Sequence, residues 1–225
     1  MGLSRPCLLL DLDGATIYGG NPRDGLRGNV TLLHPNLPQL LADSDLDVIL
    51  LTHRSAAQAA TIRSALEGSG YRFRDCVCAQ DLFYSGLRSF RLGLLLRRGL
   101  SKSLALPHLK RRFGAVPSDL VLLDDREENL QEMHKAGCAR SVLAPFDVQG
   151  EGDSRRFQTY EMAAVLAWLK DASATGRFRP EPVYRSATSC PVIAEIAAQE
   201  PSLLETLRYR INRLRKQLKR KRATS

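Results

Sequence analysis

The chain lacks a long hydrophobic run and a disulfide framework. None of its apolar runs approaches the roughly 20 residues that a membrane-spanning helix needs, and the first run is short and ends in aspartates, unlike a secretory signal. Its five Cys are odd in number, scattered, and without zinc-finger spacing. These absences predict an intracellular protein in a reducing compartment, cytoplasmic or nuclear, with no membrane partner.

Most of the chain also lacks an excess of charge of one sign. From Arg208 to Arg222 there are nine basic residues and no acidic one. Without those nine, the 33 Lys and Arg residues fall to 24, which equals the 24 Asp and Glu residues. The net charge of +9 therefore belongs to one appendage, and the rest of the chain is not expected to be a general polyanion binder.

The basic segment reads as a helix that begins at Pro201. It could be a nuclear address, a grip on nucleic-acid or ribonucleoprotein phosphates through 208–222, or a solvated charge run. Tyr209 is its one aromatic residue, which argues against base-specific reading. Helix pairing is a further alternative, because apolar residues recur at spacings of three and four: Leu204, Leu207, Ile211, Leu214 and Leu218.

The strongest local signal is Cys7–Leu10, an apolar run followed by Asp11, Asp13 and Gly14. Such a run is typical of a strand buried on both faces of a parallel sheet. Two carboxylates on one side of an extended chain repel each other, unless a divalent cation binds them or one takes up a proton. A strand followed by an aspartate-rich turn is the plainer alternative.

Similar buried strands are expected at 48–51 and 120–123, with helices between them. This alternation predicts an α/β fold, a Rossmann-like three-layer sandwich with a mainly parallel sheet, plus a C-terminal basic helix. We divide the chain into a catalytic domain over 1–172, a linker or wrapping segment over 173–200 and the basic helix over 201–225. Further expected elements are a loop at 19–31, helices at 37–43, 56–67, 101–113, 126–136 and 158–170, and short strands at 76–79, 94–96 and 140–144.

Polar residues follow three of these strands: Asp11 and Asp13, then Thr52, then Asp124 and Asp125. Because the carboxyl ends of parallel strands lie on one edge, these groups are expected to converge. Carboxylates gathered around one point favour Mg²⁺. Lys102 opens a helix before the third strand and is expected at the same edge. Lys110 is the competing cation, but its place in mid-helix favours a solvated face.

In this order, the motifs resemble those of the haloacid dehalogenase-like (HAD) hydrolase superfamily, in particular its capless phosphatase-like members. The pattern is Asp11-Leu12-Asp13-Gly14, a strand ending in Thr52, Ser101-Lys102 at a helix start, and a strand ending in Asp124-Asp125. The resemblance implies a phosphatase that acts through an aspartyl-phosphate.

The resemblance also implies roles for single residues. Asp11 would be the nucleophile and Asp13 the general acid and base. Thr52 and Lys102 would bind the phosphoryl oxygens. Mg²⁺ would lie among Asp11, Asp13 through its backbone carbonyl, and Asp124. Asp125 is a possible further ligand, although orienting waters or Lys102 suits it better. Two residues are candidates for substrate contact or for solvated loop positions: His53 and Arg54.

The expected function is therefore Mg²⁺-dependent hydrolysis of a phosphomonoester. The gaps between the motifs hold no full-sized extra domain, so an open site is expected, which favours a phosphorylated macromolecule. One departure from the family pattern is Ala15, where Thr or Val is common. The alternative is a catalytically degenerate structural component of a ribonucleoprotein or other assembly, anchored by its basic helix.

Overall fold

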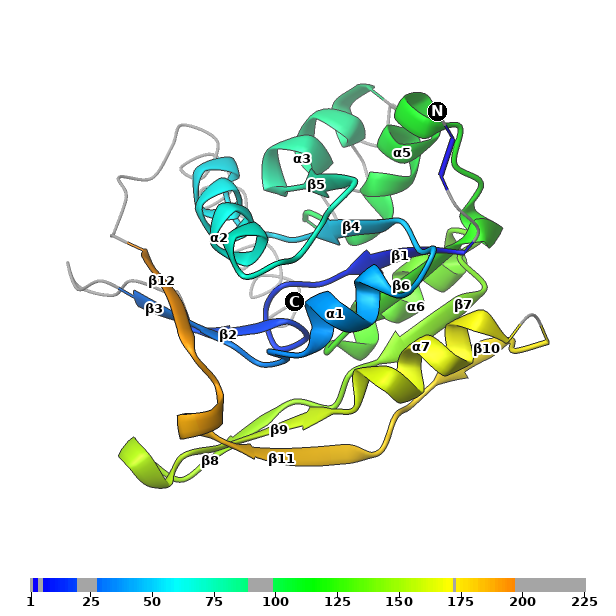
Figure 1. Ribbon diagram of the computed structural model, residues 1–225. Helices are drawn as coiled ribbons and strands as arrows, with labels where there is room; N and C mark the ends of the chain where they lie inside the picture. The colour runs from blue at the N-terminus through cyan, green and yellow to red at the C-terminus, as the bar shows by residue number, and fades with distance from the viewer. Residues whose placement is uncertain (1, 4–5, 20–27, 89–98, 172, 197–225) are drawn as a thin grey trace, which may run out of the picture.

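A computed structural model describes residues 2–3, 6–19, 28–88, 99–171 and 173–196 (Figure 1). Its centre is a six-stranded sheet in the order β10-β7-β6-β1-β4-β5, in which all neighbouring strands are parallel. The expected α/β fold with a mainly parallel sheet is confirmed. The strands are β1 (Cys7–Leu10), β4 (Val48–Leu51), β5 (Asp75–Val77), β6 (Leu120–Asp124), β7 (Arg140–Leu143) and β10 (Gly176–Phe178).

Helices cover both faces of this sheet and complete a three-layer sandwich. Successive side chains of β1 point to opposite faces, so Leu8 and Leu10 pack in one core and Leu9 in the other. This explains why the central strands are continuous apolar runs. One face carries α1 (Leu37–Ala42), α2 (Ala56–Gly68) and α7 (Met162–Lys170), and the other α3 (Ala79–Arg88), α5 (Ala105–Phe113) and α6 (Glu127–Lys135).

Two three-stranded sheets, formed largely by antiparallel pairs, lie beside the main sheet (Figure 1). The sequence did not predict them: β3 begins within the expected loop at 19–31, and β9 replaces the first turn of the helix expected from 158. Segment 173–196 contributes one strand to each of the three sheets. The added strands are β2 (Ile17–Gly19), β3 (Gly28–Leu32), β8 (Asp147–Gln149), β9 (Arg156–Tyr160), β11 (Pro182–Ser186) and β12 (Val192–Ile196).

Several helix ends follow from local sequence signals. The Ser55 hydroxyl accepts a hydrogen bond from the backbone N–H of Gln58, which caps α2. Ser101 caps the 3₁₀ turn η1 in the same way, and Gly114 ends α5 in the left-handed conformation. The 3₁₀ turns are η1 (Lys102–Leu104), η2 (Pro117–Asp119), η3 (Gly152–Ser154) and η4 (Ala187–Ser189).

Some expectations fall on other parts of the chain. The helix expected over 201–225, its apolar seam and the short strand expected at 94–96 lie outside the described residues. Within the described ranges, every helix is too short or too polar to cross a membrane.

Candidate active site

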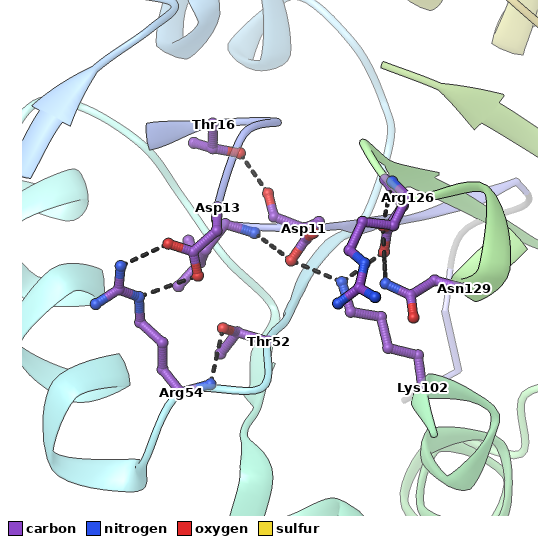
Figure 2. A network of polar contacts seen from close by, with 10 residues as sticks. Asp11, Asp13, Thr16, Thr52, Arg54, Lys102, Arg126 and Asn129 are labelled. Carbon is purple, nitrogen blue, oxygen red and sulfur yellow. Dashed lines mark hydrogen bonds and ion pairs between the residues drawn. The ribbon is translucent and has the colours of Figure 1, made fainter. Parts of the chain in front are cut away.

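Asp11 lies immediately after β1, at the carboxyl edge of the main sheet, and its backbone is fixed on both sides (Figure 2). Its N–H donates to the Leu123 carbonyl at 3.0 Å, and its own carbonyl accepts from the Thr16 hydroxyl at 2.7 Å. The Asp11 side chain is buried, and its Oδ1 accepts a hydrogen bond from Leu12 N–H at 2.8 Å. The central strand therefore holds this carboxylate in one orientation.

Lys102 lies between two of the strand-end acids. Its Nζ is 2.6 Å from Asp11 Oδ1 and 2.5 Å from Asp124 Oδ2, and its side chain is only 1% exposed. Burial alone lowers the pKa of an ammonium, but the charges of Asp11 and Asp124 outweigh burial and raise the pKa of Lys102. Lys102 is thus a buried cation. The competing residue, Lys110, is exposed on α5.

Asp124, at the end of β6, is fully buried and held by several donors. Besides Lys102, the Asn129 side-chain amide donates to both of its oxygens at 2.9 and 3.0 Å. The backbone N–H of Arg126 donates to Oδ1 at 2.9 Å. Asn129 lies on α6, so the turn after β6 brings these donors back onto the carboxylate. A buried carboxylate with this many donors is held in one orientation.

Asp125 completes a group of three acids with Asp11 and Asp124, whose ligand oxygens lie within 4.8 Å of one another. Burial, and then the charge of Asp124, raises the pKa of Asp125 to about 6. Burial and the charges of Asp124 and Asp13 likewise raise the pKa of Asp11, against the opposing effect of Lys102. Three carboxylates with one ammonium leave an excess of negative charge. An ion with oxygen ligands, such as Mg²⁺, fits this group.

Gly14 allows this approach of the acids to the turn after β1. Its φ is +76°, a value that glycine adopts readily, and a Cβ atom there would lie 2.5 Å from Asp125 Oδ2. The glycine in the motif therefore has two reasons to be there. It permits the backbone turn, and it leaves room for the Asp125 carboxylate.

Asp13 is not part of the three-acid group, and its carboxylate is 47% exposed. Arg54 holds it instead, through Nε to Oδ2 at 3.1 Å and Nη2 to Oδ1 at 2.5 Å (Figure 2). The same Nη2 donates to the Gly19 carbonyl at 2.6 Å. The sequence suggested Arg54 as a loop residue with a possible substrate contact. It did not reveal this ion pair, because the partners are far apart in the chain.

Thr52 directly follows β4 and is fully buried. Its Oγ1 accepts a hydrogen bond from Arg54 N–H at 3.1 Å, which leaves the hydroxyl proton to be donated elsewhere. Figure 2 shows it beside the Arg54–Asp13 pair. His53, between Thr52 and Arg54, is only partly buried. The structure thus brings together strand-end residues from β1, β4 and β6, with a lysine from η1.

Comparisons with known proteins identify a family but no activity. The family described as "Protein of unknown function (DUF2608)" matches residues 27–143, just over half of the chain, and the chain belongs to this family. The matched segment includes Thr52, Lys102, Asp124 and Asp125, whereas Asp11 and Asp13 precede it. No curated protein and no solved structure matches the chain.

These comparisons correct one expectation from the sequence. The assignment to the haloacid dehalogenase-like hydrolase superfamily is wrong, because the matching family is DUF2608 and no family of that superfamily matches. The four motifs are short, and their order does not identify the family. Function depends on the geometry of the chain's own residues and not on the fold alone.

Proposed function

We propose that this protein is a Mg²⁺-dependent hydrolase of phosphomonoesters in which Asp11 is the nucleophile. The observation that carries the proposal is the buried contact of Lys102 with Asp11 and Asp124, beside a third acid, Asp125. It combines a fixed carboxylate, a fixed cation and a group of oxygens suited to a divalent ion. Those are the parts that transfer of a phosphoryl group requires.

The first step uses Asp11. Both hydrogen bonds that its carboxylate accepts from the described residues end on Oδ1, so Oδ2 is available to attack phosphorus. The bond from phosphorus to the ester oxygen breaks, Asp13 gives that oxygen a proton, and an aspartyl-phosphate forms on Asp11. Water then attacks the same phosphorus after giving a proton to Asp13. The acyl-phosphate bond breaks, which releases phosphate and restores the Asp11 carboxylate.

Other residues hold the reacting groups in place. Lys102 orients Asp11 and offsets the negative charge that builds up near it. Thr52 offers a hydroxyl proton to a phosphoryl oxygen. Arg54 holds Asp13 before substrate arrives. Delivery of a proton by Asp13 requires that pair to loosen, and a phosphate dianion competes for the same guanidinium. When bound, Mg²⁺ would supply positive charge between nucleophile and phosphate, held by Asp11, Asp124 and Asp125.

The proposal includes a phosphorylated macromolecule as substrate, delivered with the help of the basic segment at 208–222. Ala15, the departure noted in the motif, is fully buried, and its carbonyl accepts a hydrogen bond from the Tyr160 hydroxyl at 2.8 Å. The position therefore has a packing role that a small side chain fills. Nothing in this contact removes an ionisable group that the reaction uses.

The test of the activity is turnover of p-nitrophenyl phosphate with Mg²⁺. Asp11→Asn keeps the size of the side chain and removes the nucleophile, so we expect a loss of more than about a thousandfold in kcat/KM. Asp45→Asn is the matched control, because Asp45 is exposed and outside the site, and it should retain wild-type activity. Equal turnover by wild type and Asp11→Asn would overturn the proposal. It would favour the alternative of a catalytically degenerate structural component.

The basic segment has its own test, a nitrocellulose-filter assay of RNA binding by the full chain at rising salt. Contacts with phosphates release counterions, so affinity should fall steeply as salt increases. Replacing Lys219, Arg220, Lys221 and Arg222 with Gln should weaken binding and flatten that dependence. A salt-independent affinity in the wild type would contradict phosphate contacts by this segment.

A further inference from the structure

A cavity of about 250 Å³ lies between α3 and α5, away from the strand-end acids. None of the residues assigned to the candidate active site lines it. Its wall combines two arginines, a histidine, a tyrosine and a serine with one acid. The lining residues are Asp81, Tyr84, Ser85 and Arg88 from α3, and His108 and Arg111 from α5.

The lining favours a negatively charged ligand. Arg88 and Arg111 are exposed guanidinium groups on opposite walls, and His108 adds a ring with a nitrogen donor. Asp81, the acid among these lining residues, is already engaged at the start of α3. Its Oδ2 accepts hydrogen bonds from the N–H and the thiol of Cys78, each at 3.0 Å. The lining therefore has two guanidinium groups against one carboxylate, and that carboxylate is hydrogen-bonded to Cys78.

Ser85 provides a second and independent observation. Its side chain is 1% exposed, and its hydroxyl has no hydrogen-bond partner among the described residues. A buried hydroxyl without a partner is costly, so proteins seldom keep one without a use. Rotation about its χ1 angle lets this hydroxyl donate to a ligand in the cavity that Ser85 lines.

Asp75 contacts two residues of α5, His108 and Arg112, and so helps to hold this helix in place. Arg112 Nη1 lies 2.9 Å from Asp75 Oδ2, and His108 Nε2 lies 3.6 Å from the same oxygen. Burial raises the pKa of Asp75, but the nearby His108 and Cys76 N–H, together with the charge of Arg112, lower it overall. Asp75 is therefore a carboxylate that takes its charge balance from Arg112. This leaves Arg111, on the cavity side, for an external anion.

We propose that this cavity binds a single phosphate group, either inorganic phosphate or the phosphate of a small monoester, between Arg88 and Arg111 with Ser85 as an additional donor. A tetrahedral phosphate presents oxygens in several directions and so matches donors from two helices. The volume lies below the roughly 300–1,000 Å³ of pockets for drug-sized ligands, which limits the ligand to a small group. This site is separate from the proposed catalytic one and does not depend on it.

Isothermal titration of the full chain with inorganic phosphate, in buffer containing EDTA, tests the proposal. Arg88→Ala and Arg111→Ala should each weaken binding at least about tenfold, because each removes one charged partner. Lys110→Ala is the matched control: Lys110 is exposed on α5 and does not line the cavity, so its affinity should stay within about twofold of wild type. No binding by wild type, or equal affinity in all four proteins, would overturn the proposal.

Two further variants separate phosphate binding in this cavity from a loss of stability and from binding at the strand-end acids. Ser85→Ala should weaken phosphate binding several-fold at an unchanged melting temperature, since the hydroxyl has no partner to lose among the described residues. Asp11→Asn should bind phosphate as the wild type does. Loss of binding in Asp11→Asn would place the phosphate at the acids instead and overturn the proposal, whatever the outcome of the hydrolysis assay.

Phenylphosphonate has a carbon–phosphorus bond and no ester to hydrolyse. Its binding distinguishes a small phosphate monoester from inorganic phosphate as the ligand. Tighter binding than phosphate, lost in Tyr84→Ala, supports a small monoester whose organic part contacts the Tyr84 ring at the cavity wall. Equal affinity for the two anions supports inorganic phosphate. Failure of both anions to bind rejects the site.

Discussion

At the residue scale, Gly14 is where the turn after β1 meets the acid group. An alanine there must adopt a φ near +76° and place its Cβ against Asp125 Oδ2. We expect Gly14→Ala to lower the free energy of unfolding by more than the approximately 1–2 kcal/mol that a left-handed alanine costs, and to reduce the proposed phosphatase activity. Urea denaturation and p-nitrophenyl phosphate turnover measure the two effects.

Gly114 offers a control for the backbone part of that cost. Its φ is +68°, and a Cβ there would meet nothing within 4 Å. Gly114→Ala should therefore show the left-handed penalty alone and retain activity. If the two variants lose the same stability and Gly14→Ala remains active, Asp125 moves away without consequence, and its place in the site is refuted.

Arg54 shows the limit of residue-level prediction. Thr52 stood at a strand end, Lys102 at a helix start and Asp124 after an apolar run, and each position was readable from local sequence. The Arg54–Asp13 pair was not, because it joins residues 41 positions apart across two loops. Pairing between loops depends on where the folded sheet places them, and neither loop carries a local signal for that contact.

At the element scale, some strands were predictable from the sequence and others were not. β1, β4 and β6 are continuous apolar runs because helices cover both faces, and all three were predicted. β9 has an uneven burial pattern, and its partner β11 alternates exposed with partly buried positions and pairs with it from more than 20 residues away. Apolar residues near 158–170 were consequently read as one helix, although α7 begins only at Met162.

A buried histidine, His34, contacts two residues of β9. The His34 ring lies 2.9 Å from the Thr159 hydroxyl and contacts the Tyr160 ring, with centroids 4.5 Å apart. Burial, and then the charge of Arg185, lowers the pKa of His34 from 6.5 to about 3. In the unfolded chain the same ring takes up a proton near pH 6.5. His34 therefore favours folding above pH 6.5, and this contribution is lost as the pH falls towards 3.

We expect urea denaturation to show about 2 kcal/mol of stability lost through His34 between pH 7 and pH 5. His34→Gln can retain a hydrogen bond to Thr159 but does not titrate, so its stability should depend less on pH by about that amount. His134→Gln, at an exposed position on α6, should keep the wild-type dependence. Identical pH dependence in wild type and His34→Gln would show that His34 takes up its proton without unfolding.

At the scale of the whole molecule, the carboxyl edge of the main sheet brings together polar residues that lie far apart in the sequence. The convergence of strand ends was predictable because it follows from a parallel sheet, whatever the details of the loops. The family was not predictable from the same motifs, since short acidic motifs at strand ends carry the chemistry of a site and little information about ancestry. The fold prediction is thus confirmed although the family assignment is wrong, and the site residues stay a prediction.

The charge of that assembled edge gives a prediction for the stability of the whole protein. A cation that binds the folded acids and not the unfolded chain should stabilise folding, by about 2.7 kcal/mol at a concentration 100 times its Kd. For a chain of this size that corresponds to a rise in Tm of roughly 5–11 °C on adding Mg²⁺, reversed by EDTA. Calorimetry with and without Mg²⁺ measures it.

Asp124→Asn and Asp45→Asn make the prediction specific to the site. Asp124→Asn removes one of the three grouped carboxylate charges, so its Tm should respond less to Mg²⁺ than that of the wild type, whatever its Tm without the ion. Asp45→Asn, exposed and distant in sequence from the acids, should keep the full response. A wild-type Tm that Mg²⁺ leaves unchanged means that the three acids do not bind the ion, and it removes the metal from the proposed reaction.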